Sequence, residues 1–334
     1  MKLTIPKGYR PTLDFFQTEK AIKLVKDTFE KKLAEKLCLQ RVSAPRFLKT
    51  GTGLQDDLAG TQVPVDFKAT YTGDTLEMVH SLAKWKRYAL GKYGFKLGTG
   101  LYTDMDAIRK DEELSDIHSI YVDQWEWEKV IEKQERTLLF LKQTVKDIYK
   151  AILETEETVC EMFPELECAL PKEIKFISTQ ELEDMYPELS SSEREDKITE
   201  KHRAIFLISI GSKLKSDKPH DLRAADYDDW TLNGDIIVWD SVRKKALEIS
   251  SMGIRVDAKA LLKQLKLRGQ EDRKDLKFHR GILEGKLPLS IGGGIGQSRL
   301  CMLLLQKAHI GEVQSSVWPK HVEEEFMEKK IVLL

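Results

Sequence analysis

Cysteine is scarce in this chain, with four residues among 334, and no two of them form a CxxC pair. They also lack the cysteine and histidine spacing of a zinc site, so the sequence implies neither zinc nor a disulfide framework. We therefore expect Cys38, Cys160, Cys168 and Cys301 to be reduced thiols that are mostly buried.

Long apolar segments are missing as well. The N-terminus, MKLTIPKGYRPTLDFF, has no hydrophobic region of a signal peptide, and the longest apolar run, 300–305, is far too short to cross a bilayer. A charge excess of one sign is also missing, because 54 basic side chains nearly balance 55 acidic ones. These absences predict a cytoplasmic protein whose partners include neither a membrane nor a nucleic acid.

The chain does contain enough apolar material for a large core, since 41% of its residues are hydrophobic. Apolar residues recur at helical spacing over 17–37 and again over 128–160. Short runs of β-branched or aromatic residues predict strands, at 63–70, 119–127, 173–178, 204–210, 235–241 and 247–256.

The order of these elements predicts the fold class. Strands and helices do not strictly alternate, and several strand runs alternate apolar with polar residues. This favours an α+β fold with an antiparallel sheet flanked by helices over a doubly wound parallel sheet. We see no clear linker and expect one domain over 1–334, with 181–202 as a solvated surface segment.

The most informative segment is 291–305, IGGGIGQSRLCMLLL, where a glycine-rich stretch leads to an arginine and an apolar helical run. Glycines let the backbone approach a base or a phosphate, and Arg299 in the first helical turn can pair with phosphate. A Walker loop is excluded because neither glycine-lysine pair is followed by serine or threonine. A dinucleotide fingerprint is excluded because its sixth position holds Gln297.

Further segments in the same chain order resemble the signature motifs of class II aminoacyl-tRNA synthetases. The segment RVSAPRFL resembles the first motif, and its Pro45 matches a proline that packs at a dimer interface. The segment IRKDEELSDIHSIYVDQWEWE resembles the second motif, and its Arg109 matches an arginine that binds the α-phosphate. The pair Asp111 and Glu112 matches an acidic position near adenine. With the glycine-rich segment, these motifs imply the class II catalytic fold.

A strand pair before the glycine-rich segment, NGDIIVWD with EISSMGIR, resembles the strands that carry metal-binding acids in that class. The matching carboxylates are Asp235 and Glu248. Mg²⁺ prefers oxygen ligands and commonly binds one or two carboxylates together with substrate phosphates. The resemblance therefore implies Mg²⁺ beside the nucleotide.

A narrower resemblance covers residues 16–318. The strings HSLAKWKR, YVDQWEWE, DLRAADYDDW, NGDI, SSMGIR and GGGIGQSR together resemble ammonia-dependent asparagine synthetase. This family implies a homodimer that joins L-aspartate to ammonia with ATP through a β-aspartyl-AMP intermediate, releasing AMP and pyrophosphate. Free ammonia is the expected nitrogen donor, because residue 2 is Lys2 and not the catalytic cysteine of glutamine-hydrolysing relatives.

The resemblance also implies the site residues. Catalysis is expected from Arg109, Asp56, Gln124 and Glu126. The aspartate pocket is expected to comprise Asp56, Ser81, Lys86, Gln124, Arg223, Asp228, Ser251 and Arg255. ATP is expected to contact Arg109, Asp111, Glu112, Glu248, Gly294 and Arg299, with Mg²⁺ on Asp235 and Glu248.

Within this pocket we expect Asp56 and Asp228 to bind the substrate ammonium group, Lys86 its α-carboxylate, and Gln124 to lie near the β-carboxyl. The family commonly has aspartate where this chain has Glu126. The group that accepts a proton from ammonium stays open among Asp56, Asp123 and Glu126.

Two other functions compete with this interpretation. A truncated aspartyl- or asparaginyl-tRNA synthetase would need tRNA, and the sequence shows no tRNA-binding domain. A catalytically silent paralogue would bind aspartate or nucleotide as a sensor or scaffold, and the joint presence of Arg109, Arg299, Asp235 and Glu248 counts against it.

Overall fold

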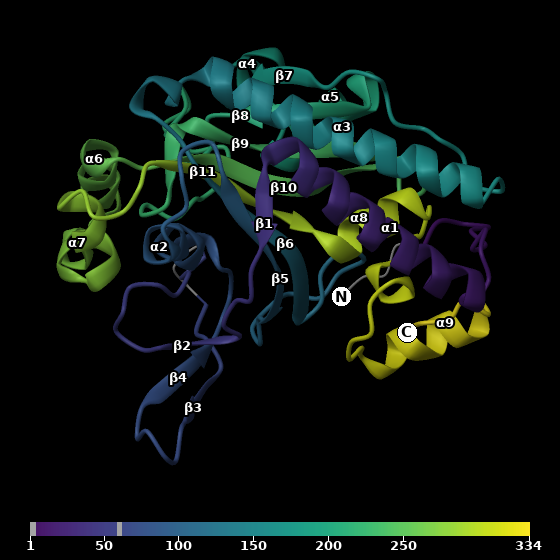
Figure 1. Ribbon diagram of the computed structural model, residues 1–334. Helices are drawn as coiled ribbons and strands as arrows, with labels where there is room; N and C mark the ends of the chain where they lie inside the picture. The colour runs from purple at the N-terminus through teal and green to yellow at the C-terminus, as the bar shows by residue number, and fades with distance from the viewer. Residues whose placement is uncertain (1–4, 59–61) are drawn as a thin grey trace.

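A mixed eight-stranded sheet forms the centre of the computed structural model, which describes residues 5–58 and 62–334 (Figure 1). Its strand order is β1-β5-β6-β11-β10-β9-β8-β7. The six central strands pair antiparallel, and the two edge pairs, β1 with β5 and β7 with β8, are parallel. The strands are β1 (Leu39–Arg41), β5 (Gly100–Ile108), β6 (Tyr121–Val130), β11 (Ser290–Gly296), β10 (Lys245–Arg255), β9 (Asp228–Asp240), β8 (Ala204–Ile208) and β7 (Lys175–Ser178). The predicted antiparallel α+β architecture is confirmed.

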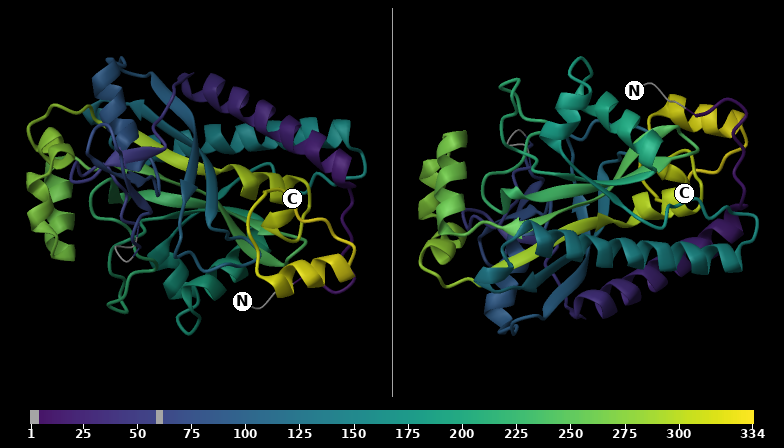
Figure 2. Two further views of the ribbon diagram at one scale, coloured as in Figure 1. Left: turned by 90° about the horizontal axis from the view of Figure 1, so that it is seen from below. Right: turned by 90° about the horizontal axis from the view of Figure 1, so that it is seen from above.

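Two long helices, α1 (Phe15–Leu37) and α3 (Leu138–Met162), lie side by side across one face of this sheet (Figures 1 and 2). The α1 helix begins at a capping box, because Asp14 Oδ1 accepts from the Gln17 backbone N–H at 2.8 Å and Gln17 Oε1 accepts from the Asp14 N–H at 3.0 Å. Its buried side chains, Val25, Phe29 and Leu33 among them, form the apolar stripe expected from the sequence.

The second predicted helix begins later than expected. Residues 128–130 belong to β6, and α3 begins only after Thr137, whose hydroxyl accepts from the Phe140 backbone N–H at 3.2 Å. The prediction of a helix from residue 128 was wrong because the apolar spacing runs on from the end of a strand into the helix, so that periodicity alone does not mark the boundary.

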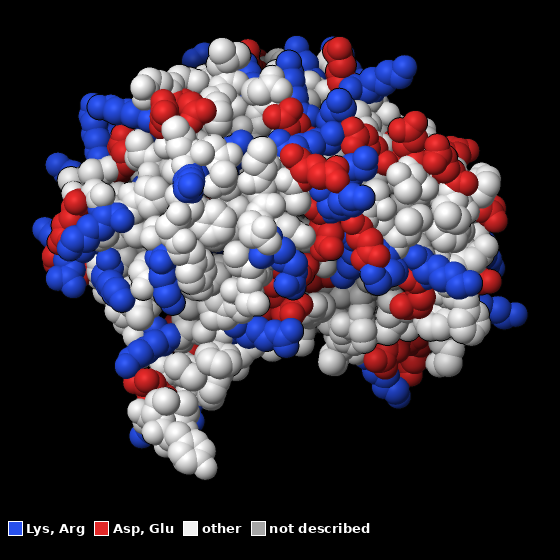
Figure 3. Space-filling view, in the orientation of Figure 1, with Lys and Arg blue, Asp and Glu red and all other residues white. Residues whose placement is uncertain are grey.

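Shorter helices surround the sheet, and a small three-stranded sheet projects from the body as an arm (Figures 1 and 3). The arm contains β2 (Phe47–Lys49), β4 (Thr75–Met78) and β3 (Asp66–Lys68). The remaining helices are α2 (Ala83–Tyr93), α4 (Thr179–Met185), α5 (Ser191–His202), α6 (Ala258–Arg268), α7 (Lys277–Leu283), α8 (Gln297–Leu304) and α9 (Lys320–Glu328), with short 3₁₀ turns at Lys133–Glu135, Glu271–Asp275 and Ile310–Glu312. No helix of the described part combines the length and apolar character needed to span a membrane.

The expectation for 181–202 was incomplete. The segment carries the end of α4 and the whole of α5, which buries Ile198, Thr199 and Arg194, while most of its other charged side chains are more exposed. Serine N-caps at Ser178 and Ser190 begin the two helices. The polar composition of an amphipathic helix therefore concealed a structured segment.

The expectation of reduced thiols was wrong for two of the four cysteines. Cys160, near the end of α3, forms a disulfide with Cys168, with 6.2 Å between their Cα atoms. The chain turns back after α3, and the Glu156 carboxylate accepts from the backbone N–H groups of Ala169 and Leu170 at 2.9 and 3.1 Å. This turn brings the two sulfurs together. Cys38 and Cys301 are free, and only Cys301 is buried.

Candidate active site

A cavity of about 270 Å³ opens where β6, β10 and β11 meet α2 and the first turn of α8. The predicted site residues line it except Asp111, which is exposed, and Asp235, which is buried beside it. The residues that the cavity brings together are Asp56, Ser81, Lys86, Arg109, Glu112, Gln124, Glu126, Arg223, Asp228, Glu248, Ser251, Arg255, Gly294 and Arg299. The tertiary structure thus gathers side chains from widely separated segments into one polar pocket.

The glycine-rich stretch is the strand β11, at the centre of the sheet between β6 and β10. A Cβ added at Gly292 would lie 2.0 Å from Glu128 Oε2, and one at Gly294 would lie 3.0 Å from Gln124 Oε1. A Cβ at Gly293 would lie 2.5 Å from the Cβ of Met252. These glycines make room for side chains of the neighbouring strands, whereas the sequence suggested room for a nucleotide.

Arg299, in the first turn of α8, is held on two sides. Its Nη1 donates to the Glu248 backbone oxygen at 3.0 Å, and its Nη2 lies 2.9 Å from Nε2 of His118. Because a guanidinium only donates hydrogen bonds, His118 Nε2 must be the acceptor, and the proton of the neutral ring is on Nδ1. His118 Nδ1 lies 2.7 Å from Ser115 Oγ, which can accept that proton's hydrogen bond. Burial and the charge of Arg299 lower the pKa of His118 to about 4, so this imidazole is neutral near pH 7.

Sequence reasoning noted His118 only as a member of the second motif. Its contact with Arg299 joins residues 181 positions apart, and no local pattern marks such a pair.

Arg109 directly follows β5, which pairs with β6, and its side chain lines the cavity. Its Nη2 donates to the backbone oxygen of His80 at 3.1 Å, and its Nη1 lies 3.8 Å from Glu112 Oε2. The guanidinium is thereby anchored by a neutral carbonyl and a distant carboxylate, and it lines the cavity. Such a fork can still pair with a phosphate or carboxylate of a ligand.

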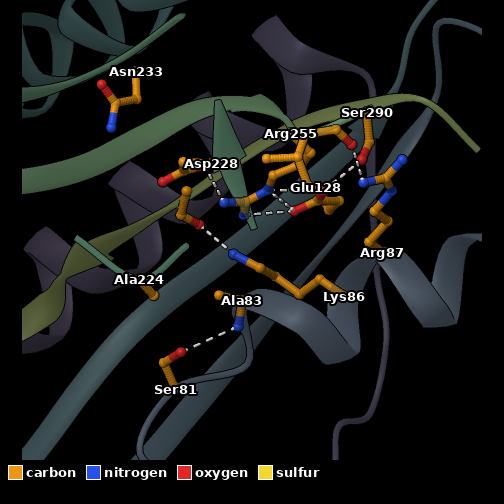
Figure 4. Close-up of polar contacts among 12 residues, drawn as sticks. Ser81, Ala83, Lys86, Arg87, Glu128, Ala224, Asp228, Asn233, Arg255 and Ser290 are labelled. Carbon is orange, nitrogen blue, oxygen red and sulfur yellow. Dashed lines mark hydrogen bonds and ion pairs between the residues drawn. The ribbon is translucent and has the colours of Figure 1, made fainter. Parts of the chain in front are cut away.

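Two cations lie in the cavity floor (Figure 4). Lys86 is fully buried, forms an ion pair with Glu126 and donates to the Gly293 backbone oxygen at 2.6 Å. Arg255 Nη1 donates to Asp228 Oδ1 at 2.5 Å, and its Nε and Nη2 face a carboxylate of β6. Burial lowers the pKa of Lys86 although Glu126 opposes the shift. Any ligand carboxylate must share Lys86 with Glu126.

Three carboxylates differ in the partners they face. Asp123 accepts from Lys26 Nζ at 3.1 Å and from the Ser298 backbone N–H at 3.0 Å. Glu126 is neutralised by Lys86, as described above. Asp56 accepts only from neutral donors, the Ser81 hydroxyl at 2.5 Å and the Leu58 backbone N–H at 2.9 Å, among the residues that the structure describes.

The two predicted metal ligands lie on neighbouring strands. Asp235 on β9 is paired opposite Ser251 of β10, and its carboxylate forms an ion pair with Arg223. Burial, with a further contribution from the nearby Glu248, raises the pKa of Asp235 against the effect of Arg223. Two mutually repelling oxygen donors fit a divalent cation that completes its shell with water and phosphate oxygens. Residues 5–58 and 62–334 contain no group of three or more His, Cys, Asp or Glu side chains placed to hold a metal ion.

We predict that His118 makes the fold sensitive to acid. Its folded pKa of about 4 lies below the ordinary 6.5, so between these values the unfolded chain binds a proton that the folded chain does not. The free energy of unfolding therefore falls as the pH drops from 6.5 toward 4. In urea unfolding at pH 7 and pH 4.5, His118→Gln should lose less stability than the parent protein. Equal losses in both proteins would contradict this role of His118.

The chain is similar to known proteins in both sequence and fold. Residues 16–330 match the sequence model of a family described as aspartate-ammonia ligase. An aspartate–ammonia ligase of Lactobacillus johnsonii is 57% identical over 327 residues, covering 97% of each chain. One from Clostridium tetani is 55% identical over 334 residues, covering 100% of this chain and 98% of the relative.

Solved structures share the fold at low sequence identity. An Entamoeba histolytica asparaginyl-tRNA synthetase in complex with asparaginyl-adenylate has a TM-score of 0.65 and 16% identity, over 90% of this chain and 66% of that chain. A Pyrococcus horikoshii asparaginyl-tRNA synthetase complexed with asparaginyl-adenylate has a TM-score of 0.61 and 18% identity, over 90% of this chain and 70% of that chain. The class II synthetase fold predicted from the motifs is confirmed.

Proposed function

The chain belongs to the aspartate–ammonia ligase family, and on this premise we propose how its cavity makes L-asparagine from L-aspartate, ammonia and ATP, releasing AMP and pyrophosphate. The observation that carries the proposal is the match over 16–330 together with a single cavity lined by both the predicted nucleotide residues and the predicted aspartate residues. We treat 1–334 as one catalytic domain. A truncated tRNA synthetase is disfavoured, because relatives named as ligases have the length of this chain.

The chemistry requires two displacements. A carboxylate is a poor electrophile, so the β-carboxylate of aspartate first attacks the α-phosphorus of ATP, forming β-aspartyl-AMP as pyrophosphate leaves. Ammonia then attacks the β-carbonyl carbon, and AMP leaves. We propose that Arg109 stabilises the charge on the α-phosphate and β-carboxylate, while Arg299 holds the nucleotide from the other side of the cavity. We also assign Glu112, Glu248 and Gly294, which line the cavity, to the nucleotide, whereas the exposed Asp111 lies outside the cavity.

The aspartate end of the cavity contains charges of both signs. We propose that Asp56 and Asp228 bind the α-ammonium group and that Lys86 binds the α-carboxylate, with Gln124 near the β-carboxyl. Arg223, Arg255, Ser81 and Ser251 complete the lining. Glu126, one methylene longer than the aspartate common in the family, forms an ion pair with Lys86.

Ammonium must lose a proton before its nitrogen attacks. Of the three candidate acceptors, Asp123 and Glu126 each form an ion pair with a lysine. Asp56 faces neutral donors alone among its described partners. Because Asp56 is also proposed to bind the cationic α-ammonium group, it is not singled out, and the proton acceptor is one of Asp56, Asp123 and Glu126.

We further propose that Asp235 and Glu248 hold Mg²⁺. Their oxygen donors and their mutual repulsion support this assignment. The ion, when bound, would supply positive charge to the phosphate oxygens of ATP. Arg223 keeps the Asp235 carboxylate fixed by its ion pair.

We predict a homodimer in a cytoplasmic enzyme. The first class II motif with Pro45 supports dimerisation, and β1 beside it is an edge strand of the sheet. Sedimentation velocity at micromolar concentration should show a species of twice the 38.4 kDa chain mass. A single 38.4 kDa species would contradict the dimer.

The activity is tested by incubating the purified protein with L-aspartate, Mg-ATP and ammonium chloride, with and without tRNA. Asparagine, AMP and pyrophosphate should form in equal amounts without tRNA. Release of ADP would argue against an adenylate, and product formation only with tRNA would favour a synthetase. Binding of aspartate without turnover would favour the sensor alternative.

A further inference from the structure

Glu128, near the end of β6, is a buried carboxylate with no role in the chemistry described above. It is fully inaccessible to solvent and lies behind the cavity floor, outside the cavity lining. Both its oxygens accept from Arg255 Nε at 3.0 Å, and Oε2 also accepts from Arg255 Nη2 at 2.7 Å. Ser290 Oγ donates to Oε1 at 2.7 Å. Figure 4 shows Glu128 and Asp228 on different sides of the Arg255 guanidinium.

Arg255 therefore serves two carboxylates at once. Its Nε edge faces Glu128 and its Nη1 faces Asp228, which lines the cavity. The two carboxylates and one guanidinium sum to one negative charge. If Glu128 were neutral, Arg255 would balance Asp228 alone, and the attraction of Asp228 for a cationic ligand group would weaken.

The geometry also leaves Asp228 partly free. Its Oδ1 accepts from Arg255, while no described donor bonds to Oδ2. Glu128 has its oxygens occupied by Arg255 and Ser290, and Gly292 leaves the space that its carboxylate fills. One carboxylate is thus saturated behind the cavity, and the other retains an acceptor within it.

We propose that Glu128 is a positioning residue for aspartate: it fixes Arg255 and offsets its positive charge, so that Arg255 does not cancel the attraction of the Asp228 carboxylate for the α-ammonium group of the substrate. The inference rests on the proposed function, because it takes the ligand at this end of the cavity to be aspartate. It adds a residue that never touches the substrate and acts through Arg255.

The test compares steady-state kinetics of Glu128→Gln with those of the parent enzyme. Glutamine keeps the shape and can still accept one hydrogen bond, but it carries no charge. We expect KM for aspartate to rise about 10- to 100-fold, by analogy with the loss seen when a residue that orients a metal ligand is removed. KM for ATP should change less than about twofold, because the side-chain hydrogen-bond partners of Glu128 are Arg255 and Ser290, neither of which is assigned to the nucleotide.

Glu183→Gln is the matched control. Glu183 is also buried and also pairs with one arginine, Arg194, and one serine hydroxyl, Ser216, but it lies on α4 away from the cavity. Both variants should lose a similar amount of thermal stability, and only Glu128→Gln should change KM for aspartate. Ser290→Ala, which removes a hydrogen bond and keeps the charge of Glu128, should leave KM for aspartate within about threefold.

The outcomes separate the two proposals. If the parent protein makes no asparagine, the proposed function fails. If the parent is active and Glu128→Gln has an unchanged KM for aspartate, or raises both KM values equally, Glu128 is not a positioning residue. Should Glu128→Gln fail to fold, the same two KM values are measured for Glu128→Asp, with Ser290→Ala as its control. We expect the shortened side chain of Glu128→Asp to raise KM for aspartate selectively. An equal rise in KM for aspartate and for ATP would overturn the inference.

Discussion

Arg109→Ala is expected to lower kcat/KM for asparagine formation by about 100- to 1000-fold, the usual loss when a charged donor at the reacting centre is removed. The arginine lines the cavity and is anchored by the His80 backbone oxygen at 3.1 Å, so its position does not depend on a bound substrate. In our mechanism it meets the α-phosphate and β-carboxylate as negative charge develops. Pyrophosphate release under saturating aspartate and ammonia measures the effect.

Two controls accompany this variant. Arg109→Lys keeps the charge without the planar fork and should recover only part of the loss, since lysine cannot donate two parallel hydrogen bonds. Arg46→Ala removes an exposed arginine that pairs with Asp106 outside the cavity and should retain full activity. A loss below about tenfold in Arg109→Ala, with thermal stability unchanged, would remove Arg109 from the catalytic step.

Gly292→Ala should destabilise the protein by about 4 kcal/mol and abolish measurable binding of aspartate. The new methyl group would lie 2.0 Å from Glu128 Oε2 and 2.7 Å from the Trp127 backbone oxygen. Neither can yield easily, because Glu128 is held by Arg255 and Trp127 belongs to the central strand β6. The added methyl group therefore both overpacks the sheet and disturbs a buried ion pair. Differential scanning calorimetry should show Tm lowered by roughly 10 °C.

Gly91→Ala provides the comparison. A Cβ at Gly91 would approach Pro288 Cδ at 3.3 Å, a side-chain contact that small shifts can relieve. Alanine also favours the α2 helix over glycine, so stability should stay within about 1 kcal/mol of the parent. If Gly292→Ala and Gly91→Ala have the same Tm, the close packing of Glu128 against β11 does not prevent a side chain at residue 292.

Much of the fold was readable from local patterns. The α1 helix and the strands β6 to β10 follow apolar periodicity, and the glycine strand with its arginine-bearing helix stands in one contiguous segment. The strand β5 was missed because GLYTDMDAI begins with glycine and carries two aspartates, so its alternation is obscured. The α3 boundary was misplaced because a strand and a helix share one continuous apolar pattern.

Local sequence patterns were enough to predict the family, the antiparallel α+β architecture and most of the charged residues that line the cavity, because these are written in contiguous motifs and in local hydrophobic spacing. Which of these charges meet depends on the assembled fold. Glu128 and Arg255 are 127 positions apart, and His118 and Arg299 are 181 apart. The Cys160–Cys168 disulfide likewise depends on how the chain turns after α3. Ion pairs and hydrogen bonds act over a few ångströms in space. The separation of two residues along the chain does not predict whether they come that close, because the assembly of the sheet brings them together.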